Sequence, residues 1–273
     1  NDTAGINVTP TSGLTTTEAG GTANFSVVLT SQPTGNVGIG LSSSDITEGT
    51  VAPISLSFTA GNWNVAQTVT VTGVDDLIVD GPIAYSIVTV AATSSDSNYN
   101  GVNASDVSVS NSDNDTASIT VVQSGGTTTV TEGGATDSYT VVLTSQPSAD
   151  VSIALTGSEV TTGPTSLIFT SANWATAQTV TVTAIDDAID EATPHAGSVT
   201  SVVTSSDSNY NGSSVAPISV SVTDNDAAGI SVTPTSGLST TEAGGTANFT
   251  VVLSSQPTGN VTIGLSSSDT TEG

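Results

Sequence analysis

Acidic residues recur at a fixed spacing in this chain, and they have no basic partners. The sequence Asp-Asn-Asp at residues 113–115 returns at 224–226, and Asp-Asp at 75–76 returns at 186–187, an interval of 111 residues. The 273 residues include 25 Asp and Glu, no Lys or Arg and one His, for a net charge of −25. Clustered carboxylates repel one another strongly when they are partly removed from water. A divalent cation with oxygen ligands is the natural missing counter-charge.

The acids fall in turns rather than along the alternating apolar runs. In an antiparallel sandwich, loops that follow alternate strands gather at one end. The turns that carry these carboxylates are therefore expected to converge there with the exit of each repeat, as a site for a hard cation that takes about six to eight oxygen ligands. A second reading stays open, in which the same acids cap turns and keep a neutral Ser/Thr surface soluble.

The spacing divides the chain into repeats of domain size. We expect a first repeat at 1–113, a second at 114–224 and the start of a third at 225–273. The first 49 residues and residues 225–273 differ at only seven positions. Because Asn1-Asp2 reads as the end of an acidic triplet, the chain is interpreted as part of a longer array. A length near 110 residues suits an immunoglobulin-like sandwich of roughly 100 residues.

Alternation of apolar and hydroxyl residues predicts an all-β fold of tandem antiparallel β-sandwiches. Val and Thr alternate over 68–72, and no stretch shows sustained helical periodicity. Seven strands are expected in the first repeat, near 6–9, 23–30, 36–41, 54–58, 67–74, 84–91 and 106–110. Few aromatic residues occur, so core positions are expected for Phe25, Phe58, Trp63, Tyr139, Phe169, Trp174 and Phe249.

Composition sets several classes of function aside. A strongly acidic chain repels the phosphates of nucleic acid and of anionic lipids, and no apolar stretch approaches the roughly 20 residues of a membrane span. We therefore expect neither nucleic-acid binding nor membrane insertion. The chain is also expected not to be an enzyme, because a catalytic carboxylate pair is normally unique while these acids recur. His195 has no Cys or second His beside it and is expected to be an exposed loop residue.

Three motifs together resemble one family. They are Thr-x-Glu-x-Gly at 16–20, Asp-Asp at 75–76 with a further acid at Asp80, and the closing Asp-Asn-Asp. This pattern resembles the Calx-β (Calx-beta) module, which implies immunoglobulin-like sandwiches, found in sodium–calcium exchangers, where some members bind Ca²⁺, and in large bacterial extracellular proteins. Cadherin repeats are a rival resemblance, but their Arg-bearing motif cannot exist in a chain without Arg.

The resemblance implies a set of Ca²⁺ ligands in the first repeat, and the second repeat offers acids in the same register. Asn114 departs from the all-acidic ending of the exchanger members, which leaves the number of ions open. Glu159 is placed where the first repeat has Asp45, and Glu191 where it has Asp80. The expected metal ligands are Glu18, Asp45, Asp75, Asp76, the Ile78 carbonyl, Asp80, Asp113 and Asp115, followed by Glu132, Glu159, Asp186, Asp187, Glu191, Asp224 and Asp226.

The function expected from these features is a calcium-stiffened spacer or fibre segment of a large secreted bacterial adhesin or extracellular filament. It would lie outside the cell or at its surface, with neighbouring repeats as partners and with lateral or end-to-end self-association into fibres. Two alternatives remain, a calcium-sensing regulatory module and a carbohydrate-binding accessory module. Ice binding by the Thr ladders is disfavoured, because twisted sandwich sheets are poorly flat.

Overall fold

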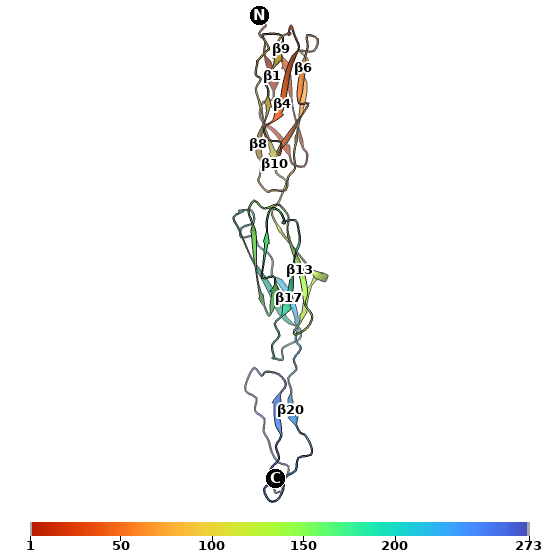
Figure 1. Ribbon diagram of the computed structural model, residues 1–273, viewed down its shortest axis with the longest axis vertical. Coiled ribbons are helices and arrows are strands. Elements are labelled where there is room, and N and C mark those ends of the chain that lie inside the picture. Colours follow the sequence, from red (N-terminus) through yellow and green to blue (C-terminus); the bar gives the residue numbers. More distant parts are fainter. Residues whose placement is uncertain (1, 272–273) are drawn as a thin grey trace. The chain divides into compact units, whose positions relative to one another are not determined.

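The computed structural model describes residues 2–271, and contacts divide the chain into two units (Figure 1). The first unit is the chain up to Ala117 together with Ser145–Ser148, and the second is Ser118–Thr144 with the chain from Ala149 onward. Over residues 2–271 the regular structure is all β, apart from one short 3-10 turn, η1 (Ser124–Gly126). No helix in that range is long and apolar enough to cross a membrane.

The first repeat is a sandwich of two sheets. One sheet has the order β1-β3-β7-β5, made of Ile6–Thr9, Thr22–Leu29, Gln67–Gly73 and Gly49–Ala52. The other has the order β2-β10-β8-β4-β6, made of Leu14–Thr17, Val107–Ser112, Ile83–Thr89, Val37–Ser43 and Ser55–Phe58, and the short β9 (Thr93–Ser94) pairs with β4. All of the pairs are antiparallel except that of β2 with β10, which is parallel.

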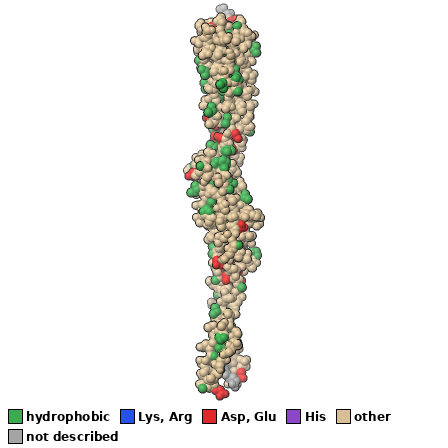
Figure 2. All heavy atoms as spheres, turned by 45° about the vertical axis from the view of Figure 1, so that its right-hand side comes forward, with side chains coloured by type: hydrophobic (Ala, Val, Ile, Leu, Met, Phe, Trp, Pro, Cys, Tyr) green, Lys and Arg blue, Asp and Glu red, His purple; other side chains and the backbone are tan. Residues whose placement is uncertain are grey.

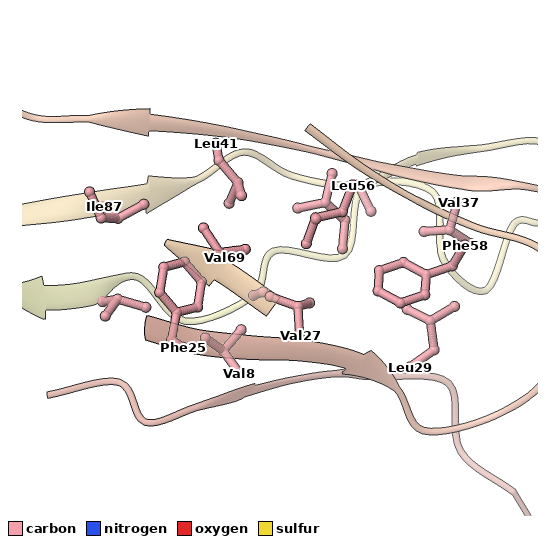
Figure 3. Packing of buried hydrophobic residues seen from close by; sticks show 14 of the residues in the cluster. Val8, Phe25, Val27, Leu29, Val37, Leu41, Leu56, Phe58, Val69 and Ile87 are labelled. Carbon is pink, nitrogen blue, oxygen red and sulfur yellow. The ribbon is translucent and has the colours of Figure 1, made fainter. Parts of the chain in front are cut away.

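The core of this sandwich follows from the alternation seen in the sequence. In β7, Val69 and Val71 are buried, while the Thr residues between and beside them face outward. Figure 3 shows the buried side chains of β3 pointing toward Leu41 and Leu56 of the facing sheet, with Phe58 filling the space beside Leu29. Burial of each such side chain contributes about 1.5 to 3 kcal/mol. This core fixes the strand ends that carry the acidic turns.

The second repeat has the same architecture. Its first sheet has the order β11-β13-β17-β15, made of Ile119–Gln123, Asp137–Leu143, Gln178–Ala184 and Val160–Gly163. Its second has the order β12-β19-β18-β14-β16, made of Thr128–Thr131, Ile218–Thr223, His195–Ser205, Val151–Ser158 and Ser166–Phe169. Here too the first strand of the second sheet, β12, runs parallel to its neighbour β19. Beyond this sandwich, β20 (Ile230–Thr233) pairs antiparallel with β21 (Thr250–Leu253).

The prediction of an all-β fold of tandem sandwiches is confirmed, and each of the seven expected strands of the first repeat corresponds to an observed one. Three strands were missed: β2, β5 and β9. β2 has the sequence Leu-Thr-Thr-Thr and β5 begins with Gly49, so neither shows an alternating apolar run. Phe25, Phe58, Tyr139 and Phe169 are buried as expected, and Trp63 packs partly buried against the core, whereas Phe249 is 43% exposed.

Candidate metal centre

The parallel pairing of β2 with β10 brings the first acidic group together. Ser112 pairs with Thr17 at the ends of these strands, so Glu18 and Asp113 leave the sheet side by side. The Glu18 amide donates a hydrogen bond of 3.1 Å to the Ser112 carbonyl, which fixes this register. Oxygen atoms of Glu18, Asp113 and Asp115 all lie within 4.8 Å of one another. These three residues are called the Glu18 group below.

Backbone amides hold the carboxylates of the Glu18 group in place. Asp113 accepts hydrogen bonds from the amides of Asp115 at 2.7 Å and Gly81 at 2.8 Å. Glu18, which is 3% exposed, accepts one from the Asn114 amide at 2.9 Å. Among the described residues, Asp115 Oδ2 is buried with no hydrogen-bond partner. Because a buried carboxylate oxygen without a partner is costly, this atom points to a missing ligand.

A second group forms where β5 meets β7. Gly49 pairs with Gly73, and the Val74 amide donates to the carbonyl of Glu48 at 3.1 Å, so Glu48 lies beside the turn that follows β7. Oxygen atoms of Glu48, Asp76 and Asp80 lie within 4.8 Å of one another. This is the Glu48 group. It adjoins the Glu18 group, because Asp113 accepts the Gly81 amide directly after Asp80.

Burial, and with it the crowding of these charges, raises the pKa of four carboxyl groups in the two clusters. Burial, and then the neighbouring carboxylates, raise the pKa of Asp80 and Asp115. Burial is also the main cause that raises the pKa of Glu18 and Glu48. Asp113 is the exception: burial opposes ionisation there too, but hydrogen bonds from three backbone amides together lower its pKa. Without Lys or Arg, the chain has no basic side chain in this repeat to relieve the repulsion.

The second repeat rebuilds the Glu18 group with the same strand register and most of the same backbone contacts. Thr131 pairs with Thr223, and the Glu132 amide donates to the Thr223 carbonyl at 3.0 Å. Oxygen atoms of Glu132, Asp224 and Asp226 lie within 4.8 Å of one another, and these residues form the Glu132 group. The Asp226 amide donates to Asp224 at 2.8 Å. In the described part of the chain, Asp226 Oδ2 and Glu132 Oε2 are buried without a hydrogen-bond partner, as Asp115 Oδ2 is in the first repeat.

Asn in the closing triplet has a structural role in both repeats. Asn114 Nδ2 donates to Asp75 at 3.1 Å, and Asn225 Nδ2 donates to Asp186 at 3.0 Å. Asn225 also donates to the carbonyl of Glu132. The amide therefore ties the Asp-Asp turn to the closing triplet, where a third carboxylate would add repulsion.

Several expected ligands lie outside these groups. Asp75, Asp186 and Asp187 are exposed on the Asp-Asp turns, and the Ile78 amide donates to Asp76 within its turn. Asp45 accepts hydrogen bonds from the amide and hydroxyl of Thr47, which lower its pKa, and it belongs to none of the groups. Glu48, which the implied ligand set omits, is the acid that the structure places beside Asp76 and Asp80.

The expected correspondence of Glu159 with Asp45 is wrong. Glu159 directly precedes β15 as Glu48 directly precedes β5, and the Glu159 carbonyl accepts the Ile185 amide as the Glu48 carbonyl accepts that of Val74. Glu159 therefore corresponds to Glu48. Its side chain is nevertheless exposed, and its backbone has φ 60°. The sequence does carry a signal for this match: Glu48 precedes Pro53 by the same number of residues as Glu159 precedes Pro164.

The expectation for His195 is also wrong, because it is not an exposed loop residue. It begins β18, and its side chain is 15% exposed. Its Nε2 lies 3.3 Å from Glu191 Oε2 and 3.9 Å from Glu132 Oε1. His195, Glu191 and Glu132 form a further set whose ligand atoms lie within 4.8 Å, called the His195 group. Glu191 thus faces a histidine, whereas Asp80 in the first repeat faces other carboxylates.

The oxygen groups fit a hard divalent cation. With bonds of about 2.3 to 2.6 Å, two oxygens on one Ca²⁺ ion lie at most about 5.2 Å apart, so separations within 4.8 Å are compatible with one ion. The buried oxygens without partners give a second, independent sign. On the face drawn in Figure 2, acidic side chains occupy a few places, and most of the surface is neither charged nor hydrophobic. On this face the acidic charge is thus gathered rather than spread evenly.

None of the protein-family models and none of the curated proteins matches this chain. Solved structures with similar architecture include the apo form of the Calx CBD1 domain, at 18% identity and a TM-score of 0.32, covering 40% of this chain and 96% of that one. The calcium binding domain CBD12 of CALX1.1 is 13% identical over 80% of this chain and 99% of its own, at a TM-score of 0.34. The D0–D1 domain of intimin is 14% identical over 80% and 96%, at 0.26. At these identities the similarities concern architecture and not function.

The fold and the acidic groups define a class: tandem immunoglobulin-like β-sandwiches with clustered carboxylates at the strand ends. The Calx domains named above are among the structural neighbours of this chain.

Proposed function

We propose that this chain is a calcium-stiffened structural segment, a spacer or fibre, of a large secreted adhesin or extracellular filament. The observation that carries the proposal is the recurrence of one carboxylate framework in two repeats, each with a buried Asp oxygen without a partner. Ca²⁺ bound there supplies the positive charge that the chain lacks. Its role is structural and not catalytic, because the groups repeat with the sandwiches.

The short segments that connect the acidic turns to the next repeat support stiffening. The closing Asp-Asn-Asp of the first repeat is followed by only three residues, 116–118, before β11 begins at Ile119. In the second unit, the Asp-Asp turn contacts the start of the third repeat: the Gln256 amide donates to the Ala188 carbonyl at 2.5 Å, and the Ala228 amide donates to Asp190 at 3.0 Å. Ordering this turn with a cation therefore also orders the contact beyond it.

Titration of the whole chain with Ca²⁺ tests this function. We expect a rise in melting temperature, equivalent to about 2.7 kcal/mol per site at a free Ca²⁺ concentration of 100 times Kd. Small-angle scattering should show a narrower spread of end-to-end lengths with Ca²⁺ than with a chelator. Unchanged stability and length with chelator would overturn the proposal.

The variant Asp76→Asn removes one carboxylate from the Glu48 group of the first repeat. It should lower Ca²⁺ affinity, because ligand charge sets affinity in oxygen sites. Asp150→Asn is the matched control, since Asp150 is exposed and belongs to none of the acidic groups. A large change of shape over a narrow range of Ca²⁺ would favour a sensing module instead.

A further inference from the structure

The His195 group has no counterpart in the first repeat. His195 pairs with Val222 as Ile83 pairs with Asn111 in the first repeat, so an imidazole stands beside the acidic turns where the first repeat has the side chain of Ile83. The replacement brings the chain's only histidine to within 3.3 Å of Glu191 and 3.9 Å of Glu132. A nitrogen ligand therefore enters one repeat and not the other.

Three polar atoms of this group, from Glu132 and His195, are buried and make no hydrogen bond within the described residues. Glu132 is 3% exposed, and its Oε2 makes no hydrogen bond among the described residues. Both ring nitrogens of His195 are likewise buried without a hydrogen-bond partner. A neutral imidazole has one donor and one acceptor nitrogen, and leaving both unsatisfied next to a buried carboxylate costs free energy. A metal ion would satisfy the imidazole acceptor and the carboxylate together.

The spacing suits a small ion with mixed ligands. In a tetrahedral zinc site, bonds of about 2.0 to 2.2 Å place neighbouring ligand atoms about 3.3 to 3.6 Å apart. The Nε2–Glu191 separation of 3.3 Å falls in this range, and the Nε2–Glu132 separation of 3.9 Å needs only a small side-chain adjustment. Imidazole favours transition metals over Ca²⁺, which prefers oxygen alone.

We propose that the second repeat holds a first-row transition-metal ion of the Zn²⁺ class between His195 Nε2, Glu191 and Glu132. Three protein ligands leave a fourth position for water. Glu132 belongs both to this group and to the oxygen group with Asp224 and Asp226, so the two sites share a ligand. The first repeat, with Ile83 in place of the histidine, keeps oxygen ligands only and prefers a hard cation. This site does not depend on the proposed structural function of Ca²⁺.

The test uses the full chain without a polyhistidine tag, so that His195 is the only imidazole. Zn²⁺ titration by calorimetry should show one site per chain that His195→Ala weakens at least tenfold, since that variant removes the imidazole ligand. Because the protein has a single histidine, its imidazole nitrogen resonances report directly on the ring, and the Nε2 signal should shift on addition of Zn²⁺. Co²⁺ should give the visible absorption of a tetrahedral site.

Two controls keep the outcomes distinct. Glu191→Gln should weaken Zn²⁺ binding, whereas Asp80→Asn, the matching change in the first repeat, should not. Ca²⁺ titration of His195→Ala should retain binding at the first repeat, so failure of the zinc site and failure of the calcium function are separately visible. Equal Zn²⁺ affinity in the original chain and His195→Ala would overturn the proposal. So would an imidazole signal that responds to pH alone, because His195 would then serve as a protonated counter-ion for the two glutamates.

Discussion

In the first sandwich the turn after β4 brings Glu48 against Asp76 and Asp80, whereas in the second sandwich the turn after β14 leaves Glu159 exposed. The segment from Leu155 to Pro164 is three residues shorter than that from Leu41 to Pro53. β14 continues to Ser158 and pairs with the unbroken β18 over eight residues, while β4 pairs with β8 over three residues and with β9 over two. Only Glu159 separates β14 from β15, and it takes a left-handed backbone conformation.

The comparison shows how one framework holds two different sets of ligands. The register of the parallel strands at the acidic end is the same in both sandwiches, so the Glu18 and Glu132 groups correspond residue for residue. The antiparallel side differs in turn length, and one carboxylate is lost from the cluster there. The second sandwich gains His195 instead, on a strand that both repeats share. Strand pairing thus sets the positions from which side chains can reach the acidic cluster. Turn length then decides which carboxylates join it.

The largest expected difference concerns the two matched glutamates. Glu48→Gln should weaken Ca²⁺ binding by about tenfold or more, because it removes the buried charged ligand of its group. Glu159→Gln should change the affinity by less than about twofold, since its carboxylate is exposed and outside the groups. Calorimetric Ca²⁺ titration of the full chain checks both. Equal losses in the two variants would mean that the second turn rearranges on binding, and the distinction between the repeats would fail.

A smaller difference is expected in the core. Tyr139 stands where the first repeat has Phe25; its side chain is 2% exposed, and its hydroxyl makes no hydrogen bond within the described residues. Burial raises the pKa of Tyr139 to about 12. Tyr139→Phe removes this unpaired group and should stabilise the second sandwich by about 1 to 2 kcal/mol. Urea unfolding checks this, with Phe25→Tyr as the reverse change in the first sandwich. A loss of stability in Tyr139→Phe would show that the hydroxyl has a partner in solution.

The smallest effect is a dependence on pH in the absence of metal. The pKa of Glu18 is raised above its ordinary value of 4.5, chiefly by burial. A raised pKa in the folded state gives stability that is fully present below the unfolded pKa and is lost as pH rises through the folded value. The stability of the original chain relative to Glu18→Gln should therefore fall as pH rises from about 4 toward neutrality.

Urea unfolding after removal of metal measures this difference at each pH. Asp150→Asn, an exposed change of the same charge, gives the baseline. Saturating Ca²⁺ should reverse the trend near neutral pH, because the bound ion favours the ionised carboxylate. A relative stability that rises with pH in the metal-free chain would contradict a buried, repelled Glu18.

Strands were predicted correctly from the sequence where apolar and polar residues alternate within the strand. They were missed where a strand pairs with its neighbours but shows no such alternation. The Val/Thr alternation of β7 is legible because one face of the strand is buried against the other sheet. β2 is harder to find, because its Thr16 is buried by hydrogen bonds to Tyr85 and Asn111 rather than by apolar packing. β2 and β5 are also the strands that deliver Glu18 and Glu48. The least visible strands in the sequence are therefore the ones that assemble the acidic groups.

The sequence by itself determined the repeat, the all-β fold and the absence of basic partners for the acids, since these depend on composition and on patterns within a few residues. The convergence of the closing Asp-Asn-Asp with Glu18 and Glu132 was decided by the parallel pairing of strands more than 90 residues apart. Tertiary structure alone also decided that Glu48 enters the cluster, that Glu159 stays out and that His195 faces two glutamates. These depend on turn length and on the direction in which a side chain leaves its strand, and neither follows from residue type or spacing.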